Sequence, residues 1–366
     1  MKIALLMLLV VFAAGCTGLS GIFGGDVLNI KQNIIQDGQK DILVVKDVAT
    51  IPKSPMLPEQ PFLFSFLVEN VDDSEIASDV TIELFNAPTV KNDAGQVCNT
   101  GSGSICKPDK CWKNAAGSGA TLPGVTLTIP GTSTSGSQDI CTILPGEQVP
   151  INFYLRTPTK EEIVNIETKP TLDYRILYSF KSTSLFVMPS VNFDEIVKNQ
   201  RSNDKVDVQI TKSYGAGPVR VDMELFGTPY ILSDQAATFI FKVTNTGGGN
   251  VVGSQIGIGK FVVEIPKDMV APNGKIILPD GQTYSPGASV SSPDRFDCTA
   301  SGTHYRCSNR KPLDIYKDQT RGSLRFEITK TAKIAQPFIS YDIRASTEYS
   351  YELRGTQEIT VKPFES

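Results

Sequence analysis

The chain has 366 residues, of which 40% are hydrophobic and 20% charged, and its formal net charge at pH 7 is −4. This composition excludes a wholly disordered chain, and the length suits two domains, each large enough to bury a core. Lysine and arginine form no block, so the electrostatic signature of nucleic-acid binding is missing.

Residues 1–15 have the features of a secretory signal peptide. Lys2 supplies a positive start, an unbroken apolar run covers 3–14, and small residues directly precede Cys16. This order of features is typical of cleaved export signals. A cysteine at this position resembles the lipobox of prokaryotic lipoproteins, with Ala13 where that motif more often has leucine. The resemblance implies that Cys16 becomes the N-terminus and carries lipid chains.

Two other interpretations compete with the lipobox. The apolar run could be a short uncleaved anchor, or Cys16 could be incidental to ordinary cleavage. A membrane-spanning helix needs about 20 apolar residues, and this run is much shorter. We therefore expect an exported protein, held by lipid at the outer face of the cytoplasmic membrane, with a flexible Gly- and Ser-containing stalk over 16–40.

Two matched sets of strands follow the stalk and indicate a tandem repeat. Alternating apolar residues predict strands with one buried face at 62–70 and 239–245. They match at a constant offset of 175: Phe64, Phe66, Val68 and Asn70 correspond to Phe239, Phe241, Val243 and Asn245. Further matched strands are predicted at 80–85 and 260–265, at 151–155 and 324–328, and at the motifs Tyr178-Ser179-Phe180 and Tyr349-Ser350-Tyr351.

The repeat sets the expected domain boundaries. We predict a first β-sandwich over 41–190 with a Cys-bearing insertion, and a second over 205–366. A linker lies between them at 191–204, where Asn192 and Glu195 have the spacing of a capping box and predict a short helix.

Seven cysteines leave an even six once Cys16 is assigned to the lipid. In an oxidising compartment, six cysteines suggest three disulfides. Cys298 and Cys307 flank a turn signal and are expected to pair. The other four are expected to pair among themselves in any of three connectivities: Cys98, Cys106, Cys111 and Cys141. A four-cysteine zinc site is the alternative, although the spacing lacks two zinc knuckles.

The F-x-F-x-V-x-N strand, the turn after it, the next strand and the closing Y-S-F or Y-S-Y strand resemble immunoglobulin-like modules related to CARDB domains. The resemblance covers about 40–190 and 205–366 and implies an all-β fold of two tandem immunoglobulin-like β-sandwiches. It also implies a lipid-anchored surface protein of the archaeal kind, with a bacterial source as the alternative. Such a likeness implies location and shape rather than activity.

Candidate residues for chemistry are few. His304 is the single histidine, so any catalytic triad would have to use it as its base. A zinc site made of histidines normally needs two or three of them, and only one is present. The stretch 253–260 lacks the spacing of a phosphate loop. Four acidic residues could hold Ca²⁺, although a solvated acidic turn is the simpler interpretation: Asp72, Asp73, Glu75 and Asp79. We therefore predict no catalytic residue, cofactor or metal.

The expected function is that of a binding or scaffold protein. Sandwich loops would contact an envelope protein or a glycan outside the cell, and the protein would reach the membrane through lipid on Cys16. Two alternatives are kept: a glycan-directed hydrolase with paired carboxylates, and an assembly or substrate-delivery lipoprotein of a membrane complex.

Overall fold

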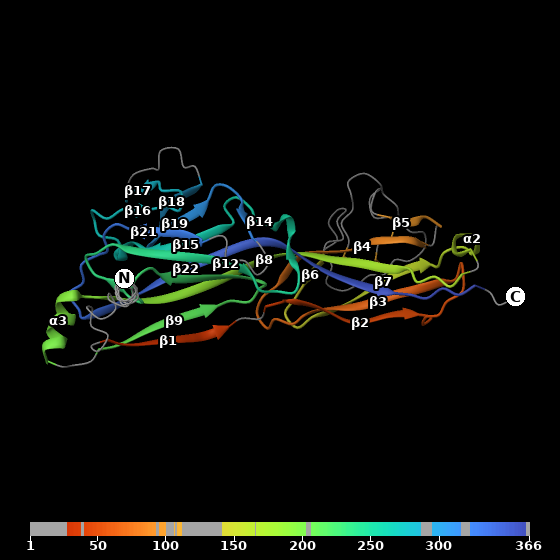
Figure 1. The fold of residues 1–366 in the computed structure, drawn as a ribbon, viewed down its shortest axis with the longest axis horizontal. Helices are drawn as coiled ribbons and strands as arrows, with labels where there is room; N and C mark the ends of the chain where they lie inside the picture. Colours follow the sequence, from red (N-terminus) through yellow and green to blue (C-terminus); the bar gives the residue numbers. More distant parts are fainter. Residues whose placement is uncertain are drawn as a thin grey trace, which may run out of the picture.

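Two strands of unusual length form the spine of the molecule. In the computed structural model, β8 (Thr171–Val191) and β22 (Phe338–Glu358) each have 21 residues and pair antiparallel along their whole length (Figure 1). Buried residues alternate with less buried ones along most of β8, as expected of a strand with one face in a core. The spine reaches from one end of the molecule to the other.

The structure describes residues 28–37, 40–92, 95–99, 106, 108–111, 141–164, 166–202, 206–286, 295–315 and 323–363. The predicted signal peptide (1–15) and Cys16 lie outside these residues. Of the strands that the structure describes, seven come before the spine strand β8 in the chain. They are β1 (Leu28–Asp37), β2 (Leu43–Ile51), β3 (Pro61–Asn70), β4 (Ala77–Asn92), β5 (Val97–Asn99), β6 (Cys141–Ile143) and β7 (Gln148–Arg156). The helices are α2 (Lys160–Ile163) and α3 (Phe193–Ser202), with 3-10 turns at Val252–Ser254 and Lys267–Met269.

The second half contributes the remaining strands, several of which are short. They are β9 (Val206–Tyr214), β10 (Val219–Leu225), β11 (Ile231–Leu232), β12 (Ala237–Asn245), β13 (Asn250–Val251), β14 (Gln255–Ile256), β15 (Phe261–Pro266), β16 (Ile276–Ile277), β17 (Thr283–Tyr284), β18 (Phe296–Ser301), β19 (His304–Asn309), β20 (Leu313–Asp314) and β21 (Ser323–Ile328). The prediction of an all-β protein is confirmed.

One large sheet runs through both halves in the order β18-β19-β15-β22-β8-β4-β7-β3-β2, and β9 and β1 extend it beside β8. A five-stranded sheet, β10-β12-β21-β16-β17, lies against it in the second half. Between these layers Phe241 packs edge-on to Phe326 with ring centroids 5.5 Å apart. In the first half Phe66 stacks on Tyr174 at 4.6 Å. Aromatic pairs of this kind anchor both cores.

The predicted strands at matched positions make equivalent pairings. Phe64 pairs with Phe153 in the first half, and Phe239 pairs with Phe326 in the second. On the spine, Ser179 is the partner of Ser350, so the two Y-S-F/Y motifs lie directly opposite each other. The two halves are therefore related by a local twofold arrangement centred on this pair.

The halves exchange their terminal strands, which the predicted boundaries did not include. The end of β22, Glu352–Glu358, pairs with the start of β8 and so joins the sheet of the first half. In return, Leu28–Asp37, assigned to the stalk by the sequence, forms β1 and pairs in parallel with β9 in the second half. Both segments find backbone hydrogen-bond partners on a sheet edge far away in sequence, which a local pattern does not reveal.

The predicted linker contains helix α3. The side chain of Asn192 accepts a hydrogen bond from the backbone N–H of Asp194 at 3.0 Å and donates to the carbonyl of Ile334 at 2.9 Å. The first contact satisfies one of the free N–H groups of the first turn. The second contact holds the start of the helix against the segment that leads into β22.

Candidate functional site

Three disulfides fix the segments that carry the cysteines. They join Cys298 to Cys307, Cys98 to Cys106, and Cys111 to Cys141. The pairing of Cys298 with Cys307 was predicted and joins directly opposite residues of the β18–β19 hairpin. For the other four, the structure selects one of the three connectivities left open. These six sulfurs are consumed in bonds and supply no free thiolate for catalysis or zinc binding.

A hollow lies on the outer face of the large sheet, in the second half of the molecule. We call it the outer-face trough, and its volume is about 470 Å³. Five neighbouring strands contribute one residue each to a single row across its floor: Ser213, Leu185, Arg344, Glu264 and Arg306. Adjacent strands are about 4.8 Å apart, so the two arginines of this row lie about 10 Å apart with Glu264 between them.

Small residues form the second row and keep the trough open. Thr183 and Ser346 are direct partners on β8 and β22, and Gly215 lies beside Thr183. A Cβ atom on Gly215 would approach the hydroxyl oxygen of Thr183 to 2.9 Å and its carbonyl oxygen to 3.0 Å. Glycine at this position therefore prevents a clash and leaves room above the sheet.

The trough is positively charged, although the whole chain carries a net charge of −4. Its lining includes three cations, Lys181, Arg306 and Arg344, and one carboxylate, Glu264. All three cationic residues are exposed. Serine and threonine hydroxyls beside the cations add hydrogen-bond donors and acceptors. The arrangement is suited to an anionic ligand that also offers hydroxyl or carbonyl groups.

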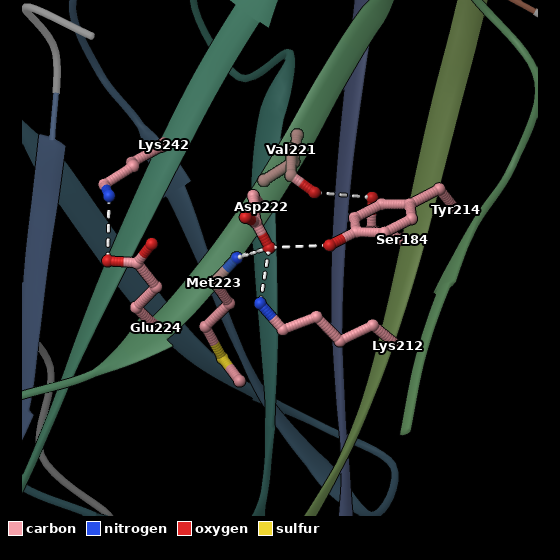
Figure 2. Close-up of polar contacts among 8 residues, drawn as sticks. All are labelled: Ser184, Lys212, Tyr214, Val221, Asp222, Met223, Glu224 and Lys242. Atoms are coloured by element: carbon pink, nitrogen blue, oxygen red, sulfur yellow. Dashed lines mark hydrogen bonds and ion pairs between the residues drawn. The ribbon is translucent and has the colours of Figure 1, made fainter. Parts of the chain in front are cut away.

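A second polar cluster connects the two sheets at their edge and has a structural character. The Asp222 carboxylate on β10 accepts hydrogen bonds from Lys212 Nζ at 2.8 Å and from the Tyr214 hydroxyl at 2.7 Å, both on β9 (Figure 2). The backbone N–H of Met223 donates to the same oxygen at 2.8 Å. The Oδ1 atom of Asp222 therefore already has three donors. We assign this cluster a structural role, in which it joins the two sheets, and not the role of a ligand-binding site.

The electrostatics of the cluster agree with that role. Burial, the largest influence, raises the pKa of the Asp222 carboxyl, but hydrogen bonds from Lys212 and Tyr214 outweigh it and hold the pKa below its ordinary value. Burial also raises the pKa of Tyr214 to about 12. The carboxylate therefore stays ionised and the phenol stays neutral at neutral pH.

The other candidates from the sequence have ordinary structural surroundings. His304 lies at the start of β19, and its Nδ1 is 2.9 Å from the hydroxyl of Thr303. In the glycine-rich stretch 253–260, which lacks the spacing of a phosphate loop, the Lys260 ammonium forms an ion pair with Glu348. Asp72 accepts hydrogen bonds from the backbone N–H groups of Ser74 and Glu75 at 2.9 and 2.7 Å.

Neither metal-binding groups nor membrane helices are found where the structure describes the chain. Within those ranges no three His, Cys, Asp or Glu side chains are grouped to hold a metal ion. None of the helices described is long and apolar enough to cross a bilayer.

The sequence did not indicate the trough. Its charged residues are spread over 181–344 and come together only through strand pairing. Each lies at an outward position of an alternating strand, where charge is expected and carries no signal by itself. Knowledge of which strands are neighbours was the missing information.

The chain matches no known protein-family model, and no curated protein matches its sequence.

Proposed function

We propose that this protein is a lipid-anchored, extracytoplasmic binding protein whose outer-face trough holds an acidic glycan of the cell envelope. The observation that carries the proposal is the row of Arg344, Glu264 and Arg306 across neighbouring strands. Sugars with carboxylate or phosphate groups pair with such cations, and their hydroxyls suit the serine and threonine side chains. The binding surface is thus a sheet face rather than the sandwich loops suggested by the sequence.

The cysteines support the extracytoplasmic part of the proposal. All six described cysteines are in disulfides, and such bonds persist mainly in oxidising compartments. The export signal and Cys16 supply the anchor in this proposal, at the outer face of the cytoplasmic membrane.

The charge pattern favours binding over hydrolysis. Enzymes that cleave glycosidic bonds commonly use two carboxyl groups that face each other. Among the described residues of the trough lining, Glu264 is the single carboxylate, and it lies between two arginines. A carboxylate in that place reduces the electrostatic repulsion between the two arginines, which suits a site that holds its ligand unchanged.

Binding of a defined polyanion tests the proposal. Polygalacturonate is titrated into the detergent-solubilised full-length protein, with dextran as the neutral glycan. We expect the protein to bind polygalacturonate and not dextran. Added salt should weaken this binding, because the contacts are between charged groups. The double variant Arg306→Gln, Arg344→Gln should bind roughly tenfold more weakly, a loss of about 1.4 kcal/mol.

The matched control is Arg325→Gln, which removes an exposed arginine of β21 in the other sheet. It should bind polygalacturonate like the unchanged protein. If the double variant bound polygalacturonate as tightly as the unchanged protein does, the trough would not be the glycan site. Equal affinity of the unchanged protein for dextran and polygalacturonate would contradict the proposal in the same way. Melting curves of each variant establish that the fold is intact.

A further inference from the structure

The first described strand shows from which end the chain enters the fold. β1 runs parallel to β9, with Leu28 opposite Val206 and Asp37 opposite Tyr214. Val206 follows helix α3 by four residues, and Tyr214 pairs with Ser184 near the middle of the molecule. Leu28 therefore lies at the α3 end, and the chain passes along the second half before it reaches the first (Figure 1).

The length of the segment between Cys16 and Leu28, compared with the length of the spine, decides which end of the molecule the lipid can reach. Leu28 is the twelfth residue after Cys16, and a chain of that length spans at most about 40 Å. The spine strands have 21 residues, which corresponds to about 65 Å at the rise of a β-strand. A lipid on Cys16 is therefore close to the α3 end and out of reach of the α2 end.

The α3 end carries aromatic side chains on its surface. Phe193, Phe226 and Phe338 are 41%, 67% and 41% exposed, and we call them the aromatic end. Phe338 is the strand partner of Val191, and the backbone N–H of Asn192 donates to Pro337 at 3.0 Å. This places Phe193 and Phe338 on neighbouring segments.

Cations accompany these aromatic side chains. Lys198, Arg201 and Lys333 are exposed at the same end, together with Asp194 of α3. The half-buried Glu195 forms an ion pair with Lys198 at 3.4 Å. Exposed phenylalanines beside lysine and arginine are the composition of surfaces that lie in the headgroup layer of a bilayer.

We infer that the aromatic end rests on the membrane and that the second half of the molecule lies next to the bilayer with the first half held away from it. This order is the reverse of the order in the sequence. The inference depends on the lipid anchor of the proposed function and adds the orientation and the contact surface.

Strand β1 maintains this orientation. While β1 is paired with β9, the tether is the short segment that precedes Leu28. If β1 detaches, the tether extends to the start of β2 near the middle of the molecule, and the α3 end is no longer held at the surface. Residues 31–34 of β1 are exposed, so at these positions backbone pairing with β9 is the main restraint.

The α2 end is the competing contact surface, because it exposes the aliphatic side chains of Ile51, Val164 and Ile166. Tryptophan probes at both ends separate the two orientations. The background variant is Trp112→Phe, which removes the single native tryptophan. Phe193→Trp marks the α3 end and Ile166→Trp the α2 end. The lipidated full-length proteins are bound to vesicles that contain brominated phospholipid, which quenches nearby indoles.

We expect bromolipid to lower the emission of the Phe193→Trp protein roughly twofold, because an interfacial side chain reaches the acyl boundary, and to leave the Ile166→Trp protein unchanged. Adding Ile30→Pro and Lys31→Pro should abolish the quenching at position 193. Neighbouring N–H groups of a strand point to opposite sides, so one of the two prolines removes a bond to β9.

Quenching only at position 166 would show that the α2 end faces the bilayer and would contradict the inferred orientation. Quenching at neither position would contradict the contact between the aromatic end and the bilayer. A separate measurement addresses the anchor. Vesicle flotation and the mass of the N-terminal peptide are compared between the unchanged protein and Cys16→Ser. Failure of both proteins to float, without lipid on Cys16, would contradict the proposed function itself rather than the orientation.

Discussion

Tyr178 of β8 and Tyr351 of β22 are direct strand partners, and their rings meet edge to face with centroids 5.6 Å apart. They form the next pair after Ser179–Ser350 in the spine, on the side toward the first half. Their hydroxyl groups differ, however. Tyr351 donates a hydrogen bond to Asn245 Oδ1 at 3.0 Å, whereas the described residues offer no partner to the buried hydroxyl of Tyr178.

This difference predicts opposite effects of the same substitution. Tyr351→Phe should lower the free energy of unfolding by about 1–2 kcal/mol, because it breaks a buried hydrogen bond. Tyr178→Phe should leave the free energy of unfolding unchanged or raise it, since it removes a buried group without a protein partner. Urea denaturation of both variants checks the pair, and an equal loss in both would contradict the assignment of partners.

The asparagine that ends each F-x-F-x-V-x-N strand has the same role in both halves. Asn70 Oδ1 accepts from the N–H of Asp72, and Asn245 Oδ1 accepts from the N–H of Gly247, both at 3.1 Å. The Asn245 side chain also donates to the carbonyl of Gly249 at 2.9 Å. Each asparagine therefore closes the turn that follows its strand.

Replacement of either asparagine by alanine should be costly. Asn70→Ala and Asn245→Ala should each lower the free energy of unfolding by about 2–3 kcal/mol, because buried backbone groups lose their partners. Asn33→Ala, at an exposed position of β1, is the control and should change stability by less than about 0.5 kcal/mol. Thermal unfolding of the three variants checks this prediction. If Asn70→Ala and Asn245→Ala were as stable as Asn33→Ala, the turns would not need the asparagine side chain.

The cluster of Figure 2 predicts a difference between two ion pairs on β10. The Lys212 side chain is 11% exposed beside Asp222, whereas Lys242 and Glu224 are 31% and 49% exposed. Asp222→Asn should cost about 1–3 kcal/mol because it leaves a mostly buried ammonium without its counter-charge. Glu224→Gln should cost less than about 1 kcal/mol.

The Asp222 pair also predicts a pH dependence. The carboxyl pKa is lower in the folded protein than its ordinary value of 3.8, so the stabilisation is complete above that value and is lost as the pH falls through the folded pKa. The difference in unfolding free energy between the unchanged protein and Asp222→Asn should be constant from pH 5 to 8 and shrink below about pH 4. A difference that persists at low pH would exclude the ion pair as its cause.

Buried tyrosines predict sensitivity to alkali. Burial raises the pKa of Tyr341 and Tyr351 to about 12, and it raises the pKa of Tyr349 as well. The neutral phenols stabilise the fold fully below the ordinary value of 10, and this contribution is lost as the pH rises through the folded pKa values.

The free energy of unfolding should therefore fall between about pH 10 and 12. Tyrosinate absorbance and circular dichroism, recorded together, should change in one transition. Ionisation of most tyrosines in a protein that keeps its circular dichroism would contradict the prediction.

The glycine-rich turn of the second half shows where sequence and tertiary structure divide. The sequence predicts a turn at Gly247-Gly248-Gly249, but the reason for glycine lies in residues that are distant in the chain. Asp41 accepts hydrogen bonds from the N–H of Gly248 at 3.1 and 3.0 Å. A Cβ on Gly249 would approach the carbonyl oxygen of Glu352 to 2.2 Å. The corresponding turn of the first half, at 71–74, carries larger residues.

Local patterns by themselves determined the strands at 62–70 and 239–245, the helix after Asn192 and the Cys298–Cys307 hairpin, because alternation, capping and turn residues act over a few positions. Tertiary structure alone decided the exchange of β1 and the end of β22, and the row of Arg344, Glu264 and Arg306. A strand's sequence specifies which of its faces is buried, but its neighbour is chosen by hydrogen bonding and packing between residues that are distant in the chain.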